Sequence, residues 1–134
     1  MAKISDIEGI GPVYAEKLAG VDIRTVEKLL EVGATRKGRK EIAEKTGISD
    51  TLILEWVNLA DLFRIKGIGE EFSDLLEEAG VDTVKELAQR NAENLVAKIE
   101  EVNAEKKLVR RTPNLNMVKD WIEQAKLLPR VVEY

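Results

Sequence analysis

The chemistry open to this chain is limited by the side chains it lacks, because its 134 residues include no His and no Cys. Disulfides, thiolate nucleophiles and histidine acid–base catalysis are therefore excluded, and so are zinc sites built from His and Cys. Carboxylates, lysines and hydroxyls remain, but no glycine-rich loop carries the Lys-Ser/Thr pair that holds phosphate and Mg²⁺. We expect a protein that is not an enzyme and that uses no cofactor or metal.

Two Gly-x-Gly turns are the first candidates for a binding site. Each turn precedes a predicted helix whose first N–H groups have no partner within the helix and can bind an anion. Glycine also allows positive φ and lets a partner approach the backbone closely. The candidate phosphate-binding residues are Gly9, Ile10, Gly11 and Val13 at the first turn and Lys66, Gly67 and Gly69 at the second.

The two turns differ in the residues that follow them. Glu70 and Glu71 follow the second turn, where carboxylates repel a phosphate but interact favourably with the helix dipole. Pro12 and Val13 follow the first turn and bring no charge. For both turns, a purely structural role in the fold remains the alternative to a binding role.

Two clusters of cations are the second set of candidates. They comprise Arg36, Lys37, Arg39 and Lys40, and later Lys106, Lys107, Arg110 and Arg111. Cations at a helix start oppose the helix dipole, so either an anionic partner or a solvated face paired with Glu41 and Glu44 explains the first cluster. Gly38 could let a phosphate approach that cluster. No aromatic residue is interleaved with either cluster, which argues against stacking on unpaired bases.

The aromatic residues are better explained by packing than by binding. Trp56 and Trp121 each follow apolar residues at helical spacing, which predicts that both lie in the core. Tyr14 and Phe72 are also expected in the core, and Tyr134 is assigned to a tail.

Composition favours an all-α protein of one domain or two very small ones. Hydrophobic residues make up 44%, charged residues 34% and aromatic residues only 4% of the chain. The net charge of −4 excludes a uniformly basic protein that coats nucleic acid, but it allows a local basic patch. No uncharged run is long enough to span a membrane and no signal peptide is visible, so we expect a cytoplasmic protein.

The chain contains an internal repeat. Residues 7–29 align with residues 65–87 without gaps at an offset of 58, and eight of the 23 aligned positions are identical. A weaker match at an offset of 65 pairs Trp56 with Trp121. We therefore predict two copies, residues 1–62 and 63–128, packed as one compact helical domain and followed by a tail, residues 129–134.

Capping signals place the helices that carry these residues. Thr25, Thr35 and Ser49 are predicted N-caps in the first copy, and Thr112-Pro113 is predicted to start the last helix. Gly47 and Gly80 are expected to end helices, and the repeat aligns Asp22 with Gly80. The predicted helices cover about 12–20, 26–31, 36–46, 50–63, 70–79, 84–90, 92–106 and 113–127.

The repeated pattern resembles the helix-hairpin-helix motif. Ile4-x-x-Ile7-x-Gly9-Ile10-Gly11-x-x-x-Ala15-x-x-Leu18 carries the resemblance, and Leu62-x-x-Ile65-x-Gly67-Ile68-Gly69-x-x-x-Ser73-x-x-Leu76 matches it again. The whole chain is similar to a prokaryotic family of small tandem helix-hairpin-helix proteins of uncharacterised function. The resemblance implies an all-α fold of two tandem repeats, with hairpins that hold a nucleic-acid phosphate without reading sequence.

Two functions follow as hypotheses. The first is weak, sequence-nonspecific binding of nucleic-acid backbone, with double-stranded DNA as the expected partner. The contacts would come from the two turns and from the cations Arg36, Lys37, Arg39, Lys40, Arg110 and Arg111. The alternative is a protein-interaction or adaptor module that keeps the fold without binding nucleic acid. Neither hypothesis involves a membrane, and the oligomeric state is not predicted.

Overall fold

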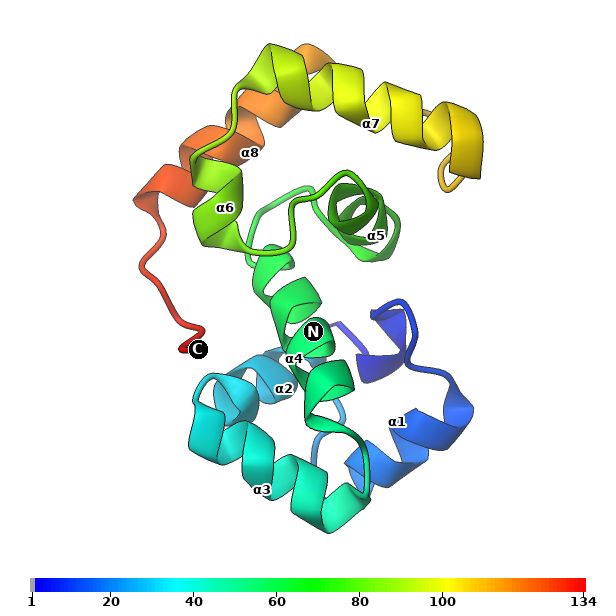
Figure 1. Ribbon diagram of the computed structural model, residues 1–134, viewed down its shortest axis with the longest axis vertical. Coiled ribbons are helices and arrows are strands. Elements are labelled where there is room, and N and C mark those ends of the chain that lie inside the picture. Colours follow the sequence, from blue (N-terminus) through cyan, green and yellow to red (C-terminus); the bar gives the residue numbers. More distant parts are fainter. Residues whose placement is uncertain (1) are drawn as a thin grey trace. The chain divides into compact units, whose positions relative to one another are not determined.

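The computed structural model describes residues 2–134, which form helices joined by short loops (Figure 1). The helices are α1 (Pro12–Ala19), α2 (Val26–Gly33), α3 (Arg36–Thr46), α4 (Asp50–Leu62), α5 (Glu70–Glu78), α6 (Val84–Ala88), α7 (Ala92–Lys106) and α8 (Leu115–Leu127), preceded by a 3₁₀ turn, η1 (Ile4–Asp6). Within the described residues no strand is present, apart from one isolated bridge between Lys3 and Thr25. The all-α prediction is confirmed. None of these helices combines the length and the apolar character needed to cross a membrane.

The chain divides into two compact units. Unit 1 comprises Met1–Asp61 together with Val131–Tyr134, and unit 2 comprises Leu62–Arg130. The segment 131–134, which the sequence assigns to a tail, therefore belongs to unit 1. Its backbone is held there by a hydrogen bond from the Glu133 N–H to the Ala34 carbonyl oxygen, at 2.7 Å.

Three helices, α2, α3 and α4, start at the predicted side-chain caps. The hydroxyl oxygens of Thr25 and Thr35 accept hydrogen bonds from backbone N–H groups three residues later, both at 3.0 Å. Ser49 does the same at the start of α4, at 3.2 Å. Gly47 ends α3 with a φ of 75°, as predicted. Each cap pairs an N–H group that the helix itself leaves unpaired.

The start of α8 differs from the prediction. Asn114, and not Thr112, is the N-cap, and its side-chain oxygen accepts a hydrogen bond from the Met117 N–H at 2.8 Å. Pro113 lies before the helix and is buried. Both Thr112 and Asn114 are good cap residues, and the structure selects the second of them, so α8 begins two residues later than predicted.

The two halves of the repeat follow the same local backbone path. Hydrogen bonds within residues 7–29 recur 58 positions later within residues 65–87. Each of these bonds runs from a backbone N–H group to a carbonyl oxygen. The matching pairs are Ile10 to Ile7 with Ile68 to Ile65, Ala15 to Gly11 with Ser73 to Gly69, and Ile23 to Leu18 with Val81 to Leu76. The internal repeat in the sequence therefore corresponds to a repeated local structure.

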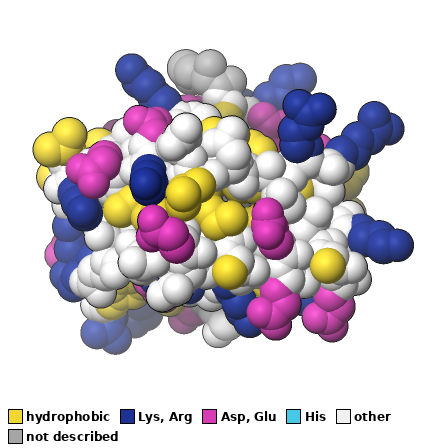
Figure 2. Space-filling model, turned by 90° about the horizontal axis from the view of Figure 1, so that it is seen from above, with side chains coloured by type: hydrophobic (Ala, Val, Ile, Leu, Met, Phe, Trp, Pro, Cys, Tyr) yellow, Lys and Arg dark blue, Asp and Glu magenta, His cyan; other side chains and the backbone are white. Residues whose placement is uncertain are grey.

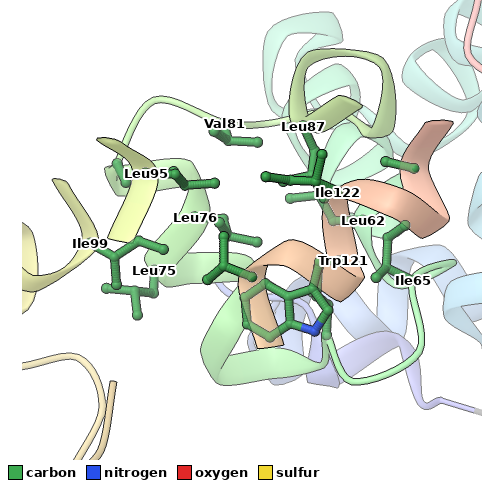
Figure 3. Packing of buried hydrophobic residues seen from close by; sticks show 14 of the residues in the cluster. Leu62, Ile65, Leu75, Leu76, Val81, Leu87, Leu95, Ile99, Trp121 and Ile122 are labelled. Atoms are coloured by element: carbon green, nitrogen blue, oxygen red, sulfur yellow. The ribbon is translucent and has the colours of Figure 1, made fainter. Parts of the chain in front are cut away.

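Each unit has its own apolar core with one tryptophan in it. In unit 1, Trp56 is buried and its ring lies 5.0 Å from that of Tyr14 in an edge-on arrangement. In unit 2, Trp121 packs with Leu62, Ile65 and the leucines of α5 to α7 (Figure 3). The prediction that both tryptophans are core residues is confirmed, because less than a twentieth of either side chain is exposed.

Candidate anion-binding surfaces

The first Gly-x-Gly turn has an inner side and an open side. Gly9 has a φ of 94°, and a Cβ there would lie 3.3 Å from Nε1 of Trp56. Ile10 is buried below the turn. Gly11 is exposed, and among the described residues beyond its chain neighbours no atom lies within 4 Å of the Cβ position it leaves empty. Gly9 and Ile10 therefore hold the turn on the core, while Gly11 faces open space.

The open side of this turn presents backbone N–H groups and an apolar side chain. Within the described residues, no acceptor pairs with the N–H groups of Gly11 and Val13, because the first helical bond of α1 is donated by Ala15. Val13 is 67% exposed. The amides of this surface can donate hydrogen bonds to a phosphate oxygen, but Gly11, Pro12 and Val13 bring no cation.

The second turn is more occupied than the first. The N–H and the carbonyl of Lys66 both bond to the side chain of Gln124, at 2.9 and 3.1 Å, so this amide is not available to a ligand. Gly67 has a φ of 100° and packs on Trp121, with 2.9 Å from a Cβ position to Nε1. Gly69 is open, but the exposed Glu70 and Glu71 follow it. Of the predicted contacts here, the Lys66 side chain remains exposed.

A groove in unit 1 is lined by all four residues of the first basic cluster. It has a volume of about 520 Å³ and is lined by Arg36, Lys37, Arg39, Lys40, Asp50, Leu54 and Tyr134. Arg36, Lys37 and Lys40 are exposed. Within residues 2–134, none of these three side chains forms an ion pair with a carboxylate, and the predicted partners Glu41 and Glu44 are no exception. Below, we call this site the α3 groove.

Arg39 differs from its three neighbours, because only 7% of it is exposed. Its guanidinium donates hydrogen bonds to the carbonyl oxygens of Gly33 at 2.8 Å and Ala34 at 3.1 Å, and to that of Glu133. Burial lowers the pKa of Arg39 from its ordinary value, and the nearby charge of Arg36 acts in the same direction. The Arg39 side chain therefore pairs with the carbonyl oxygens at the end of α2 and anchors residues 131–134 through Glu133. In a binding site it could contribute only from the buried base of the groove.

Gly38 also has a structural explanation that the sequence does not reveal. A Cβ at this position would lie 1.9 Å from the Val32 carbonyl oxygen. The glycine is therefore required by the close passage of the end of α2 over the start of α3. This internal contact explains the glycine without a phosphate.

The sequence did not predict Asp50, Leu54 or Tyr134 in the groove, and the aromatic residue among them is Tyr134. It is 51% exposed, and its hydroxyl donates a hydrogen bond to Oδ1 of Asn58 on α4 at 3.0 Å. No aromatic residue stands near Arg36 in the sequence, which led to the expectation that no ring accompanies the cations. The structure corrects this, because folding brings a residue about a hundred positions away to the same groove.

The second basic cluster is not organised in the same way. Arg110 and Arg111 are exposed in the loop before α8. The Lys106 ammonium pairs with the Glu78 carboxylate, and this hydrogen bond and the opposite charge raise the pKa of Lys106. The carboxylates of Asp74, Glu77 and Glu78 lie within 4.8 Å of one another, so the Lys106 ammonium supplies a cation beside the acidic group.

The candidate surfaces of unit 1 are separate from each other. In Figure 1, α1 begins on the opposite side of unit 1 from the start of α3. The first turn and the α3 groove therefore cannot hold the same phosphate. On the face drawn in Figure 2, basic and acidic side chains are interspersed. Because the net charge of the chain is −4, an anion-binding surface on it must be a local basic patch.

A comparison with protein families identifies the family of this chain. A domain of unknown function, DUF4332, matches residues 8–128, which include both Gly-x-Gly turns, both basic clusters and both tryptophans. The chain belongs to the DUF4332 family. Searches of curated proteins and of solved structures find no match to this chain.

Proposed function

We propose that this DUF4332 chain binds the backbone of nucleic acids without reading base sequence and that it is not an enzyme. The observation that carries the proposal is the α3 groove, where Arg36, Lys37 and Lys40 are exposed and make no ion pair within the described residues. Three unpaired cations around one groove attract a polyanion in a chain whose overall charge is negative. The supporting feature is the first turn, with its open amides at Gly11 and Val13.

We further infer that the two Gly-x-Gly segments are tandem helix-hairpin-helix copies. Their shared hydrogen bonds and positive φ values at Gly9 and Gly67 support this inference. Unit 1 then carries the main contacts, and unit 2 adds Lys66, Arg110 and Arg111 at most. Glu70 and Glu71 oppose a phosphate at the second turn.

The expected mode of binding is electrostatic. Backbone amides and point charges contact phosphates and do not distinguish base edges, so affinity should not depend on base sequence. If Arg36, Lys37 and Lys40 neutralise three phosphates of a duplex, the slope of log K against log salt should be about −3. The dissociation constant at physiological salt should lie in the nonspecific range, about micromolar or weaker.

The test is a fluorescence-anisotropy titration with labelled oligonucleotides from 20 mM to 200 mM salt. We expect Arg36→Glu with Lys37→Glu to weaken binding to every sequence and to reduce the magnitude of the salt slope by about two. Lys45→Glu with Lys85→Glu is the matched control, because it makes the same change in net charge at exposed lysines outside the groove. Equal losses in both double variants would refute a local site.

An adaptor function is the second candidate. The exposed Val13 at the start of α1 and the paired carboxylates of Glu70 and Glu71 favour a protein partner over a phosphate at the two turns. Absence of binding to any oligonucleotide at 20 mM salt would favour this candidate and exclude the first.

A further inference from the structure

We infer that the α3 groove holds one unpaired nucleotide of a single strand, with its phosphate at the cations and its base against Tyr134; this inference rests on the proposed function. The groove has two chemically different parts. One part is made by Arg36, Lys37 and Lys40, and the other by Tyr134 and Leu54. A ligand that fits both parts carries an anionic group beside a flat apolar one.

The dimensions of the groove suit such a ligand. Its volume of about 520 Å³ lies within the range of about 300–1,000 Å³ that pockets for small ligands occupy. A duplex keeps its bases paired and stacked, so its backbone alone could reach the cations. A single strand can turn a base towards an aromatic side chain, which is how proteins bind unpaired bases without reading sequence.

The position of Tyr134 is fixed by contacts within unit 1. Its hydroxyl bonds to Asn58, and the preceding residue is held at both backbone groups, by Ala34 through its N–H and by Arg39 through its carbonyl. The side chain is nevertheless half exposed and lines the groove. An anchored ring at the edge of a basic groove is ordered before a ligand arrives, which lowers the entropy cost of stacking.

Asp50 is the one acidic side chain among the described residues that line the groove, and its charge opposes an anionic ligand. It is exposed at the first position of α4 and lines the same groove as the three cations. A phosphate seated there is repelled by this carboxylate, so a ligand in the groove should respond to its removal. Asp50→Asn should therefore strengthen binding of a single strand about twofold or more.

The experiment compares a labelled oligothymidine with a duplex of equal length, using the full chain at low salt. The wild type should bind the single strand more tightly than the duplex. Tyr134→Leu should weaken single-strand binding at least about fivefold and leave duplex binding unchanged, because stacking is lost and the cations remain. Tyr134→Phe is the control, since it keeps the ring and removes the hydroxyl that bonds to Asn58.

The outcomes separate this inference from the proposed function. If both oligonucleotides bind and Tyr134→Leu changes neither affinity, the nucleotide pocket is refuted while backbone binding stands. If Tyr134→Phe loses as much single-strand affinity as Tyr134→Leu, the ring is not the contact and the inference is also wrong. If the wild type binds neither oligonucleotide, the proposed function fails and the inference fails with it.

Discussion

The roles of Arg36 and Arg39 can be separated by making the same substitution at both positions. The two arginines lie three residues apart on α3 and both line the α3 groove, but one is exposed and the other is buried. Arg39→Met removes three hydrogen bonds to backbone carbonyls and leaves an unbranched side chain of similar length. Arg36→Met removes an exposed cation that has no ion pair.

The magnitude follows from the three acceptors of Arg39. A hydrogen bond from a charged donor contributes about 1.5–3 kcal/mol, and the bond to Gly33 is fully buried. The carbonyls of Ala34 and Glu133 are partly buried, so water can replace the guanidinium at these two. Removing the buried charge also removes its desolvation cost. We expect Arg39→Met to destabilise unit 1 by about 2–4 kcal/mol, and Arg36→Met to change its stability by less than about 0.5 kcal/mol.

Hydrogen exchange read by mass spectrometry resolves the two units peptide by peptide. Arg39→Met should speed exchange in the peptides of unit 1, including the Glu133 amide that bonds to Ala34, and should leave unit 2 unchanged. Arg36→Met should leave exchange unchanged but weaken oligonucleotide binding, with a loss of about one from the salt slope. If Arg39→Met has wild-type exchange, or if both variants weaken binding equally without loss of stability, our assignment of Arg39 is refuted.

Two further predictions concern glycine positions in the repeat. Asp22 has a φ of 64° where the aligned Gly80 has 94°, so Asp22→Gly should stabilise the protein by up to about 1 kcal/mol in urea denaturation, and Gly80→Ala should destabilise it by about 1–2 kcal/mol. If the Asp22→Gly variant were less stable than the wild type, the backbone strain at this aspartate would be negligible. Gly67→Ala should lower the melting temperature by several degrees, because its Cβ would lie 2.9 Å from Trp121, whereas Gly69→Ala should lower it much less. Equal shifts at both positions would contradict the packing of this turn on the tryptophan.

Short-range signals predicted much of the helical structure. The caps at Thr25, Thr35 and Ser49 and the glycine at the end of α3 act on backbone groups within a few residues, so their effects can be read from local sequence. The prediction for α8 was wrong because Thr112 and Asn114 offer the same kind of cap two residues apart. The local sequence does not determine which of the two residues caps the helix. In the structure Asn114 is the cap, and Pro113 directly before it is buried.

The sequence by itself determined that this chain is helical, that its two Gly-x-Gly turns are repeated, and that chemistry based on His or Cys is excluded. It also located the cations of α3. Only the tertiary structure decided which of them are accessible: Arg39 is buried because carbonyls from α2 and from Glu133, 94 positions away, surround its guanidinium. Tyr134 reaches the same groove through a bond to Asn58 that spans 76 positions. Burial and such long-range contacts depend on the folded path of the whole chain, and neither charge patterns nor helical spacing encode them locally.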